Sequence, residues 1–434
     1  MFLPDCLTVD QQDRLLIGGV SVLKLASDYG TPLYIMDENQ IEQNGRAFLS
    51  ALRTHYGENG EIAFASKAFS VTAMYRTLQR IGLWSDVVSG GELHTALKAG
   101  FDPSHLIFHG NSKTRHELNF AIFSDVGRII VDNIEELALL DQLALENNKM
   151  VQVGIRIRPG VDAHTHDFIT TGQLDSKFGV PIEGGLALDF IGEVLQKRNL
   201  TLASLHCHIG SQIFDVEPFA FTADVMLHLM ADAKACFGYE IPELNLGGGF
   251  GIRYTETDDP RSIDACIAAS AAAVKASAAK YALSLPRLFF EPGRSMVAEA
   301  GITVYETVAV KELPGLNIKN YILVDGGMGD NPRYVLYGAE YAAVLPSRVH
   351  APAEQTYTVA GRCCESGDVV VASCALPTVK AGELIAVLST GAYNYSMASN
   401  YNRVPRPPVV FVKDGAARLV VRRETYDDVC QCDL

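Results

Sequence analysis

The segment Phe289-Phe290-Glu291-Pro292-Gly293-Arg294 joins an apolar run to a carboxylate, a turn and a guanidinium. Similar short apolar runs that end in polar residues recur along the preceding chain, and longer stretches with a helical spacing of apolar residues separate them. This alternation is typical of repeated βα units. We count eight such runs, at 62–66, 85–89, 106–109, 128–132, 151–158, 203–209, 243–247 and 288–291.

Helical patterns fall between the runs, for example at 91–99, 134–146, 219–235 and 263–281. Eight strands, each followed by a helix, predict an α/β protein with a closed (β/α)8, TIM-like barrel, although the periodicity also allows an open doubly wound sheet. Most unusual polar clusters lie at the carboxyl ends of the runs. Barrel enzymes build their active sites at those ends, so the clusters favour the barrel.

After about residue 302 the pattern changes to strand-like segments separated by glycine and proline, which predicts a second, mainly β domain. These segments lie at 320–324, 356–360, 384–388 and 409–412. Two N-terminal runs, 14–17 and 32–36, precede the first barrel unit, and we expect them to pack with the C-terminal segments. The predicted domains are therefore 1–37 (first part of the β domain), 38–302 (barrel) and 303–434 (remainder of the β domain).

The composition narrows the class of protein. A formal charge of -15 over 434 residues opposes binding to nucleic acid and to anionic membranes. The sequence has neither a run of about 18 apolar residues nor a basic start followed by an apolar stretch, so we expect a cytoplasmic protein. The nine cysteines predict reduced thiols. Cys430 and Cys432 lack a second ligand pair, and no metal site is predicted.

The first run ends in Ala65-Ser66-Lys67-Ala68. An apolar setting at the barrel mouth would favour the neutral amine of Lys67. A neutral amine can attack an aldehyde, which is how lysine holds pyridoxal phosphate. A merely solvated lysine at a strand end is the simpler alternative.

Two histidines, His206 and His208, end the sixth run and would share one face of the sheet. Zinc is one interpretation, but no third ligand follows nearby. The turn that includes Ser211 suits a phosphate oxygen, and an imidazole could stack on an aromatic ring.

Gly247, Gly248 and Gly249 close the seventh run and would let backbone N–H groups approach an anion. Their spacing is not that of a dinucleotide fingerprint. A tight turn without a ligand is the alternative.

The eighth run offers three chemical groups. Glu291 could hold a pyridine nitrogen protonated, the N–H of Gly293 could bind phosphate, and Arg294 could bind a substrate carboxylate. A surface ion pair between Glu291 and Arg294 is the alternative. Farther on, the thiol of Cys364 lies beside acids and could protonate a carbanion, although such cysteines are usually structural.

Taken in order, these motifs resemble the fold-type III pyridoxal-phosphate decarboxylases over nearly the whole chain. The matching motifs are 65–68, 208–212, 247–249, 291–294, 364–368 and 391–393. Four further stretches resemble the branch of that family that acts on diaminopimelate, namely 159–166, 176–179, 396–402 and 422–426. The resemblance implies conversion of meso-2,6-diaminopimelate to L-lysine and carbon dioxide, the last step of lysine biosynthesis.

The resemblance also implies how pyridoxal phosphate binds. Lys67 would bond covalently to the cofactor, His208 would stack on its ring, and Glu291 would pair with its nitrogen. Asp86 would lie near Lys67. The remaining cofactor contacts would come from Ser211, Gly247, Gly248, Gly249, Pro292, Gly293, Arg294 and Tyr393.

For the substrate, the resemblance implies that Arg294, Arg333 and Tyr337 hold the distal carboxylate, with Tyr393 beside them. Glu365 would receive the distal ammonium, and Cys364 would return a proton to the substrate carbon. A homodimer is implied, in which Cys364 and Glu365 reach the partner's site. The sequence departs from the family pattern at Tyr334 and at Arg362-Cys363.

Three other functions fit parts of the pattern. They are a decarboxylase of the same fold for ornithine, arginine or carboxynorspermidine, a catalytically silent relative, and a racemase with a similar barrel. Arg294 argues against the first, because a substrate without a distal carboxylate would leave the guanidinium unpaired. Lys67 and Cys364 together argue against the second. The third lacks the two-base pattern and would release no carbon dioxide.

Overall fold

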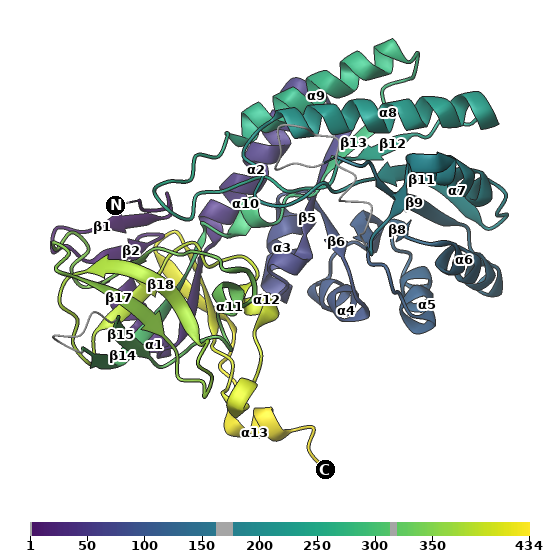
Figure 1. Cartoon of the computed structure of the whole chain (residues 1–434). Helices are drawn as coiled ribbons and strands as arrows, with labels where there is room; N and C mark the ends of the chain where they lie inside the picture. The colour runs from purple at the N-terminus through teal and green to yellow at the C-terminus, as the bar shows by residue number, and fades with distance from the viewer. Residues whose placement is uncertain (1, 162–176, 313–318) are drawn as a thin grey trace. The chain divides into compact units, whose positions relative to one another are not determined.

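The computed structural model describes residues 2–161, 177–312 and 319–434 (Figure 1). The chain divides into two compact units. The barrel unit comprises Asn44–Gly251 and Asp259–Gly293, and the β unit comprises Met1–Gln43, Ile252–Asp258 and Arg294–Leu434. The predicted domain limits at residues 37 and 302 stay a prediction.

Eight parallel strands close into a ring in the barrel unit, because the last strand, β13, pairs back to the first, β5. A closed ring has no edge strands, so the predicted barrel is confirmed and the open doubly wound sheet is excluded. In ring order the strands are β5 (Gly60–Ala65), β6 (Trp84–Val87), β7 (Leu106–Phe108), β8 (Arg128–Val131), β9 (Val151–Arg158), β11 (Leu200–His206), β12 (Glu243–Asn245) and β13 (Arg287–Phe290). A two-residue strand, β10 (Val180–Pro181), adds to β9 outside the ring.

Helices follow the barrel strands (Figure 1). They are α3 (Thr72–Arg80), α4 (Gly90–Ala99), α5 (Arg115–Phe123), α6 (Ile134–Glu146), α7 (Leu186–Leu195), α8 (Glu217–Phe237) and α9 (Ile263–Lys280). Side-chain caps begin several of them: Ser89, Thr114 and Asn133 each accept a hydrogen bond from the backbone N–H three residues later. Polar residues in the loops after the strands therefore start these helices.

One layer of the barrel interior is apolar. The residues that fill it come from neighbouring strands, and all of them are buried: Ala63, Trp84, Ile107, Ile130 and Phe289. This packing occupies the interior with side chains, so chemistry is left to the rim of the barrel.

The β unit combines both ends of the chain in one sheet, as predicted. Strand β4 (Leu33–Asp37) lies between two C-terminal strands, antiparallel to β14 (Gly301–Lys311) and parallel to β20 (Val409–Lys413). The sheet continues through β15 (Asn320–Val324), β17 (Gln355–Ala360) and β18 (Val369–Leu376) on one side and β21 (Ala416–Val421) on the other. Strand β19 (Leu384–Val387) pairs with β14 and with β16 (Ala343–Val344).

Smaller elements complete the β unit. They are β1 (Leu7–Val9), β2 (Leu15–Ile17), β3 (Val20–Ser21), α1 (Val22–Tyr29), α10 (Arg294–Val297), α11 (Arg333–Tyr337), α12 (Asn394–Met397) and α13 (Tyr426–Cys430). Helix α2 (Glu38–His55) begins in the β unit and ends in the barrel unit. Among the described helices, none is both long and apolar enough to cross a membrane.

Candidate active site

Four neighbouring strands of the barrel carry the residues that the sequence singled out. Lys67 follows β5, Glu291 follows β13, the turn of three glycines follows β12, and His208 lies two residues beyond β11. These strands are adjacent in the ring order β11-β12-β13-β5. Because the carboxyl ends of parallel strands meet at one rim, the fold gathers these four groups at one side of the barrel mouth.

Lys67 lies in a single 3-10 turn, Ser66–Ala68, in which both neighbours are buried and Lys67 is exposed. The predicted apolar setting of Lys67 is therefore wrong, because the turn directs the two small residues inward and the lysine outward. The charge of its ammonium acts on two carboxylates, Asp86 and Glu92. Burial raises the pKa of both, and the Lys67 charge opposes the rise. The charge of Lys67 thus acts on Asp86, and a contact of Asp86 with the cofactor stays a prediction.

Both carboxylates also hold the turn that carries the lysine. The backbone N–H of Ser66 donates to Asp86 Oδ1 at 2.7 Å, and the Ser66 hydroxyl donates to Glu92 Oε2 at 2.9 Å. Glu92 also accepts from the N–H of Val88 at 2.8 Å. Glu92 was not among the residues expected at the site, although the spacing Ser89-x-x-Glu92 is that of a helix capping box and marks it in the sequence.

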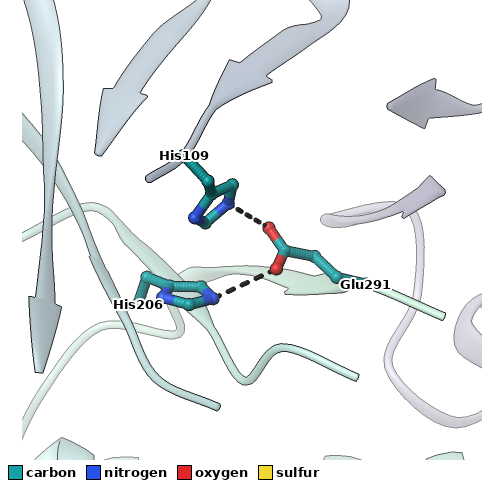
Figure 2. A group of neighbouring side chains, drawn as sticks. All are labelled: His109, His206 and Glu291. Carbon is teal, nitrogen blue, oxygen red and sulfur yellow. Dashed lines mark hydrogen bonds and ion pairs between the residues drawn. The ribbon is translucent and has the colours of Figure 1, made fainter. Parts of the chain in front are cut away.

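Glu291 accepts three side-chain hydrogen bonds at the rim, and Figure 2 shows the two from His109 and His206. Its Oε1 accepts from His109 Nε2 and from Asn245 Nδ2, each at 2.7 Å, and its Oε2 accepts from His206 Nε2 at 3.0 Å. Glu291 is only 7% exposed, which excludes the alternative of a surface ion pair. Burial by itself would raise the pKa of Glu291, but His109 and His206 lower it well below its usual range. The carboxyl group is therefore ionised.

This cluster changes the interpretation of the histidines. The sequence pointed to His206 and His208 without a third ligand, whereas ligand atoms of His109, His206 and Glu291 all lie within 4.8 Å of one another. The side-chain Nδ2–H of Asn245 points at Glu291 Oε1, and a cation bound to that oxygen would repel this N–H group. Hydrogen bonding to a carboxylate accounts for the arrangement better than metal ligation.

The turn after Glu291 packs tightly against the turn of Lys67. The carbonyl of Pro292 accepts a hydrogen bond from the N–H of Ala65 at 3.0 Å. A Cβ on Gly293 would lie 2.9 Å from that of Ala65 and 3.2 Å from that of Ala68. Only glycine permits this approach, which joins the carboxylate and the lysine in one rigid corner.

The glycine turn after β12 also packs closely on its neighbours. Gly247 and Gly249 have φ angles of +67° and +113°, and a Cβ on Gly248 would lie 2.1 Å from the carbonyl oxygen of Glu291. Close packing therefore explains why these residues are glycines. Phosphate binding by this turn and by the exposed Ser211 stays a prediction.

His208 lies beside the glycine turn. A Cβ on Gly247 would come within 3.2 Å of the His208 side chain. Burial and the charge of Lys67 lower the pKa of His208 to about 3, so its ring is neutral. A neutral, flat ring at the rim fits the predicted stacking on a pyridine ring, which the structure does not test.

The β unit holds a second group of predicted residues. The guanidinium carbons of Arg294 and Arg333 lie 4.9 and 5.0 Å from the centre of the Tyr393 ring, and Arg333 also lies 5.2 Å from that of Tyr337. Tyr254, which the sequence analysis missed, accepts a hydrogen bond from Arg294 Nη1 at 2.7 Å. Two cations and three tyrosines thus form one cluster.

Hydrogen bonds to Asp368 hold the turn that carries Cys363 and Cys364 in the β unit. Asp368 is buried and accepts hydrogen bonds from the N–H groups of Met328 at 2.6 Å and Cys363 at 2.7 Å. Cys364 and Glu365 are exposed, and the N–H of Cys364 donates to Asn402 at 2.8 Å. Burial and Asp368 raise the pKa of the Cys363 thiol to about 11. Of the two adjacent thiols, Cys364 is the more exposed, and its role as a proton donor stays a prediction.

Part of the resemblance falls on residues that the structure does not describe. Residues 162–166 of the stretch 159–166, and Ser176 of the stretch 176–179, lie outside the described residues.

The residues at the rim fit pyridoxal phosphate chemically. An exposed amine that can bond to an aldehyde and an ionised, buried carboxylate lie on joined turns, beside a neutral imidazole and a glycine turn. A family model described as "Pyridoxal-dependent decarboxylase, pyridoxal binding domain" matches residues 38–298. The fold and the family model together define the class of this protein as a pyridoxal-phosphate-dependent decarboxylase.

Relatives that match over the full chain show which family of these decarboxylases the protein belongs to. The chain is 47% identical to diaminopimelate decarboxylase of Bacillus subtilis (strain 168), over 100% of this chain and 98% of that protein. It is 45% identical to the Bacillus methanolicus enzyme of the same name, over 96% of each. A crystal structure of diaminopimelate decarboxylase from M. jannaschii in complex with L-lysine superposes with a TM-score of 0.92 at 34% identity, covering 100% of this chain and 99% of that one. The chain belongs to the diaminopimelate decarboxylase family.

Proposed function

We propose that this chain converts meso-2,6-diaminopimelate to L-lysine and carbon dioxide, as the final step of lysine biosynthesis in the cytoplasm. The observation that carries the proposal is the corner at the barrel rim, where the lysine turn and the ionised Glu291 pack together. The full-length relatives named above support the choice of substrate.

Bound pyridoxal phosphate would supply an electron sink for the electron pair that remains when carbon dioxide leaves. Lys67 Nζ would hold the cofactor covalently, Glu291 would bind its ring nitrogen, and His208 would lie against its ring. The phosphate would be bound by Ser211, Gly247, Gly248, Gly249, Gly293 and Tyr393, with Pro292 and Arg294 completing the contacts.

Arg294 and Arg333 would bind the distal carboxylate of the substrate, together with Tyr337 and Tyr393. Arg333 is only 8% exposed, and within the described part of the chain it forms no salt bridge and its Nε has no hydrogen-bond partner. A buried cation without an anion is costly, so a carboxylate ligand would relieve the cost. Ornithine and arginine have no second carboxylate and would leave this cation unpaired.

Cys364 would return a proton from its Sγ to the substrate carbon, and Glu365 would bind the distal ammonium. Both side chains are exposed on this chain, as expected for residues that serve the active site of a partner subunit. The proposal therefore includes a homodimer in which each chain lends Cys364 and Glu365 to the other.

The test is to incubate the purified protein with pyridoxal phosphate and meso-diaminopimelate and to measure lysine and carbon dioxide. Ornithine and arginine serve as competing substrates, and a preference for either would overturn the proposed substrate. Lys67→Ala should abolish both turnover and the visible absorbance of the lysine-bound cofactor. Lys98→Ala, at an exposed position on α4, is the matched control and should change neither.

A further inference from the structure

The carboxylate of Glu291 has almost exhausted its capacity to accept hydrogen bonds. An ionised carboxylate offers about four lone-pair sites, two on each oxygen. His109 and Asn245 occupy both sites on Oε1, and His206 occupies one site on Oε2. Figure 2 shows the two bonds from the histidines. Among the described residues no fourth donor reaches the carboxylate, which leaves one site, on Oε2.

The three donors are held rigidly. His206 is the last residue of β11, Asn245 is the last residue of β12, and His109 directly follows β7. All three are at most 3% exposed. Two of these residues belong to barrel strands and the third directly follows one, so the fold limits how far each donor can turn away from Glu291.

Hydrogen bonding also determines which nitrogen of each histidine carries the proton. Burial lowers the pKa of His109, and it lowers the pKa of His206 to about 4, so both rings are neutral and carry one proton each. A carboxylate only accepts, so that proton must lie on Nε2. A proton on Nδ1 of His206 would also be unfavourable for a second reason. That nitrogen is buried and has no hydrogen-bond partner in the described part of the chain.

The loop that carries His109 has an anchor of its own. Lys113 Nζ donates to the carbonyls of Gly110 at 2.6 Å and Ile130 at 2.7 Å, and to Glu136 at 2.6 Å. The N–H of His109 donates to the carbonyl of Val87 at 2.8 Å. These bonds tie the loop to the two flanking strands and fix the direction of the imidazole.

We propose that His109, His206 and Asn245 are positioning residues that keep Glu291 ionised and leave only one lone pair, on Oε2, for the protonated ring nitrogen of the cofactor. This inference rests on the proposed function. Donors to a carboxylate favour its charged form. Without them, Glu291 would take up a proton in its buried site and could no longer hold the ring nitrogen protonated.

The test uses pyridoxal phosphate labelled with 15N in the ring, bound to the full-length protein, and the readout is the 15N chemical shift. In the wild type and in His206→Gln, whose amide reaches as far as Nε2, the ring nitrogen should be protonated. In His206→Leu and His109→Leu it should lose its proton, and kcat should fall about 100-fold. A purely structural role would lower the melting temperature and leave the nitrogen protonated.

A double variant tests whether the histidine acts through Glu291. Glu291→Gln alone should leave the nitrogen unprotonated, and adding His206→Leu should cause no further loss of kcat. Should leucine prevent folding, the pair His206→Gln and His206→Asn repeats the comparison, because asparagine is polar but too short to reach Oε2.

The outcomes separate the two proposals. A wild-type protein that fails to bind the cofactor through lysine overturns the proposed function. A wild-type protein that binds it, with a ring nitrogen protonated equally in the leucine variants, overturns only the positioning role.

Discussion

The hydroxyl of Tyr254 accepts a hydrogen bond from Arg294 Nη1 at 2.7 Å, and the guanidinium carbon lies 5.7 Å from the centre of the Tyr254 ring. Tyr254 is 9% exposed, and its ring packs edge-on against Tyr341 at 5.4 Å. The tyrosine is therefore rigid, and its hydroxyl fixes one nitrogen of a guanidinium that is proposed to bind substrate.

Tyr254→Phe removes that hydroxyl and keeps the ring. We expect KM for diaminopimelate to rise about three- to tenfold, the value of one lost hydrogen bond, while kcat changes less. Steady-state assays of lysine formation measure both constants. Tyr281→Phe is the control. Tyr281 directly follows α9, and this variant likewise removes a hydroxyl, one that donates to Asp224. An unchanged KM in Tyr254→Phe would contradict the prediction.

The two adjacent thiols should behave differently. Cys364→Ser should lower kcat about 100-fold, because a serine hydroxyl is a much weaker acid than the thiol proposed to protonate the substrate carbon. Cys363→Ser should lower it less than about threefold, since that thiol is half-buried against Asp368. Equal losses in the two variants would contradict the assignment of the proton to Cys364.

The proposed sharing of active sites between two subunits leads to a prediction for mixed dimers. Lys67→Ala and Cys364→Ala should each be inactive. After the two are unfolded, mixed and refolded together with cofactor, statistical pairing should restore about a quarter of the wild-type activity. Refolding each variant alone is the control. No recovery in a mixture whose mass shows dimers would mean that each chain uses its own cysteine.

The buried pair Lys113–Glu136 should contribute strongly to stability. The two side chains are 1% and 4% exposed, and their charged atoms are 2.6 Å apart. Lys113→Met leaves a buried carboxylate and two backbone carbonyls without their donor, so the free energy of unfolding should fall by about 3–5 kcal/mol. Adding Glu136→Met should recover at least half of the loss. Denaturant titrations followed by circular dichroism measure the free energy of unfolding. If Glu136→Met lowered it further in the double variant, the prediction would be contradicted.

Stability should depend on pH through Asp330. Burial raises the pKa of this carboxyl to about 7, although the hydroxyl of Tyr305 donates to it at 2.7 Å. Between the usual aspartate pKa of about 4 and about 7, the folded chain binds this proton more tightly than the unfolded chain does. Its contribution to stability is therefore present at low pH and is lost as the pH rises through 7.

Asp330→Asn removes this titration and keeps an oxygen for Tyr305. From about pH 5 to about pH 8, the stability of the variant relative to the wild type should increase by roughly 2 kcal/mol. Denaturation at several pH values measures the difference, with Asp427→Asn, on the exposed start of α13, as the control. A difference that does not change with pH would show that Asp330 does not titrate in this range.

Much of the barrel could be predicted from local pattern. All eight apolar runs became strands, because a strand buried on both faces needs a short continuous apolar segment and its neighbours need helical spacing. The ends were less certain: the run predicted at 203–209 is β11 at Leu200–His206. His208 therefore lies beyond the strand, where a loop can present its ring.

The sequence by itself determined the alternation of strands and helices, the glycine turns and the order of the family motifs, since each depends on residues close together in the chain. Only the tertiary structure decided which polar groups meet. His109 and Glu291 are 182 positions apart, and His206 and Glu291 are 85 apart. Closing the ring brings the ends of β7, β11 and β13 to one rim. Because Glu291 is buried there, its charge depends on the hydrogen bonds that it accepts. No local pattern carries that information, because it arises from the closure of the barrel.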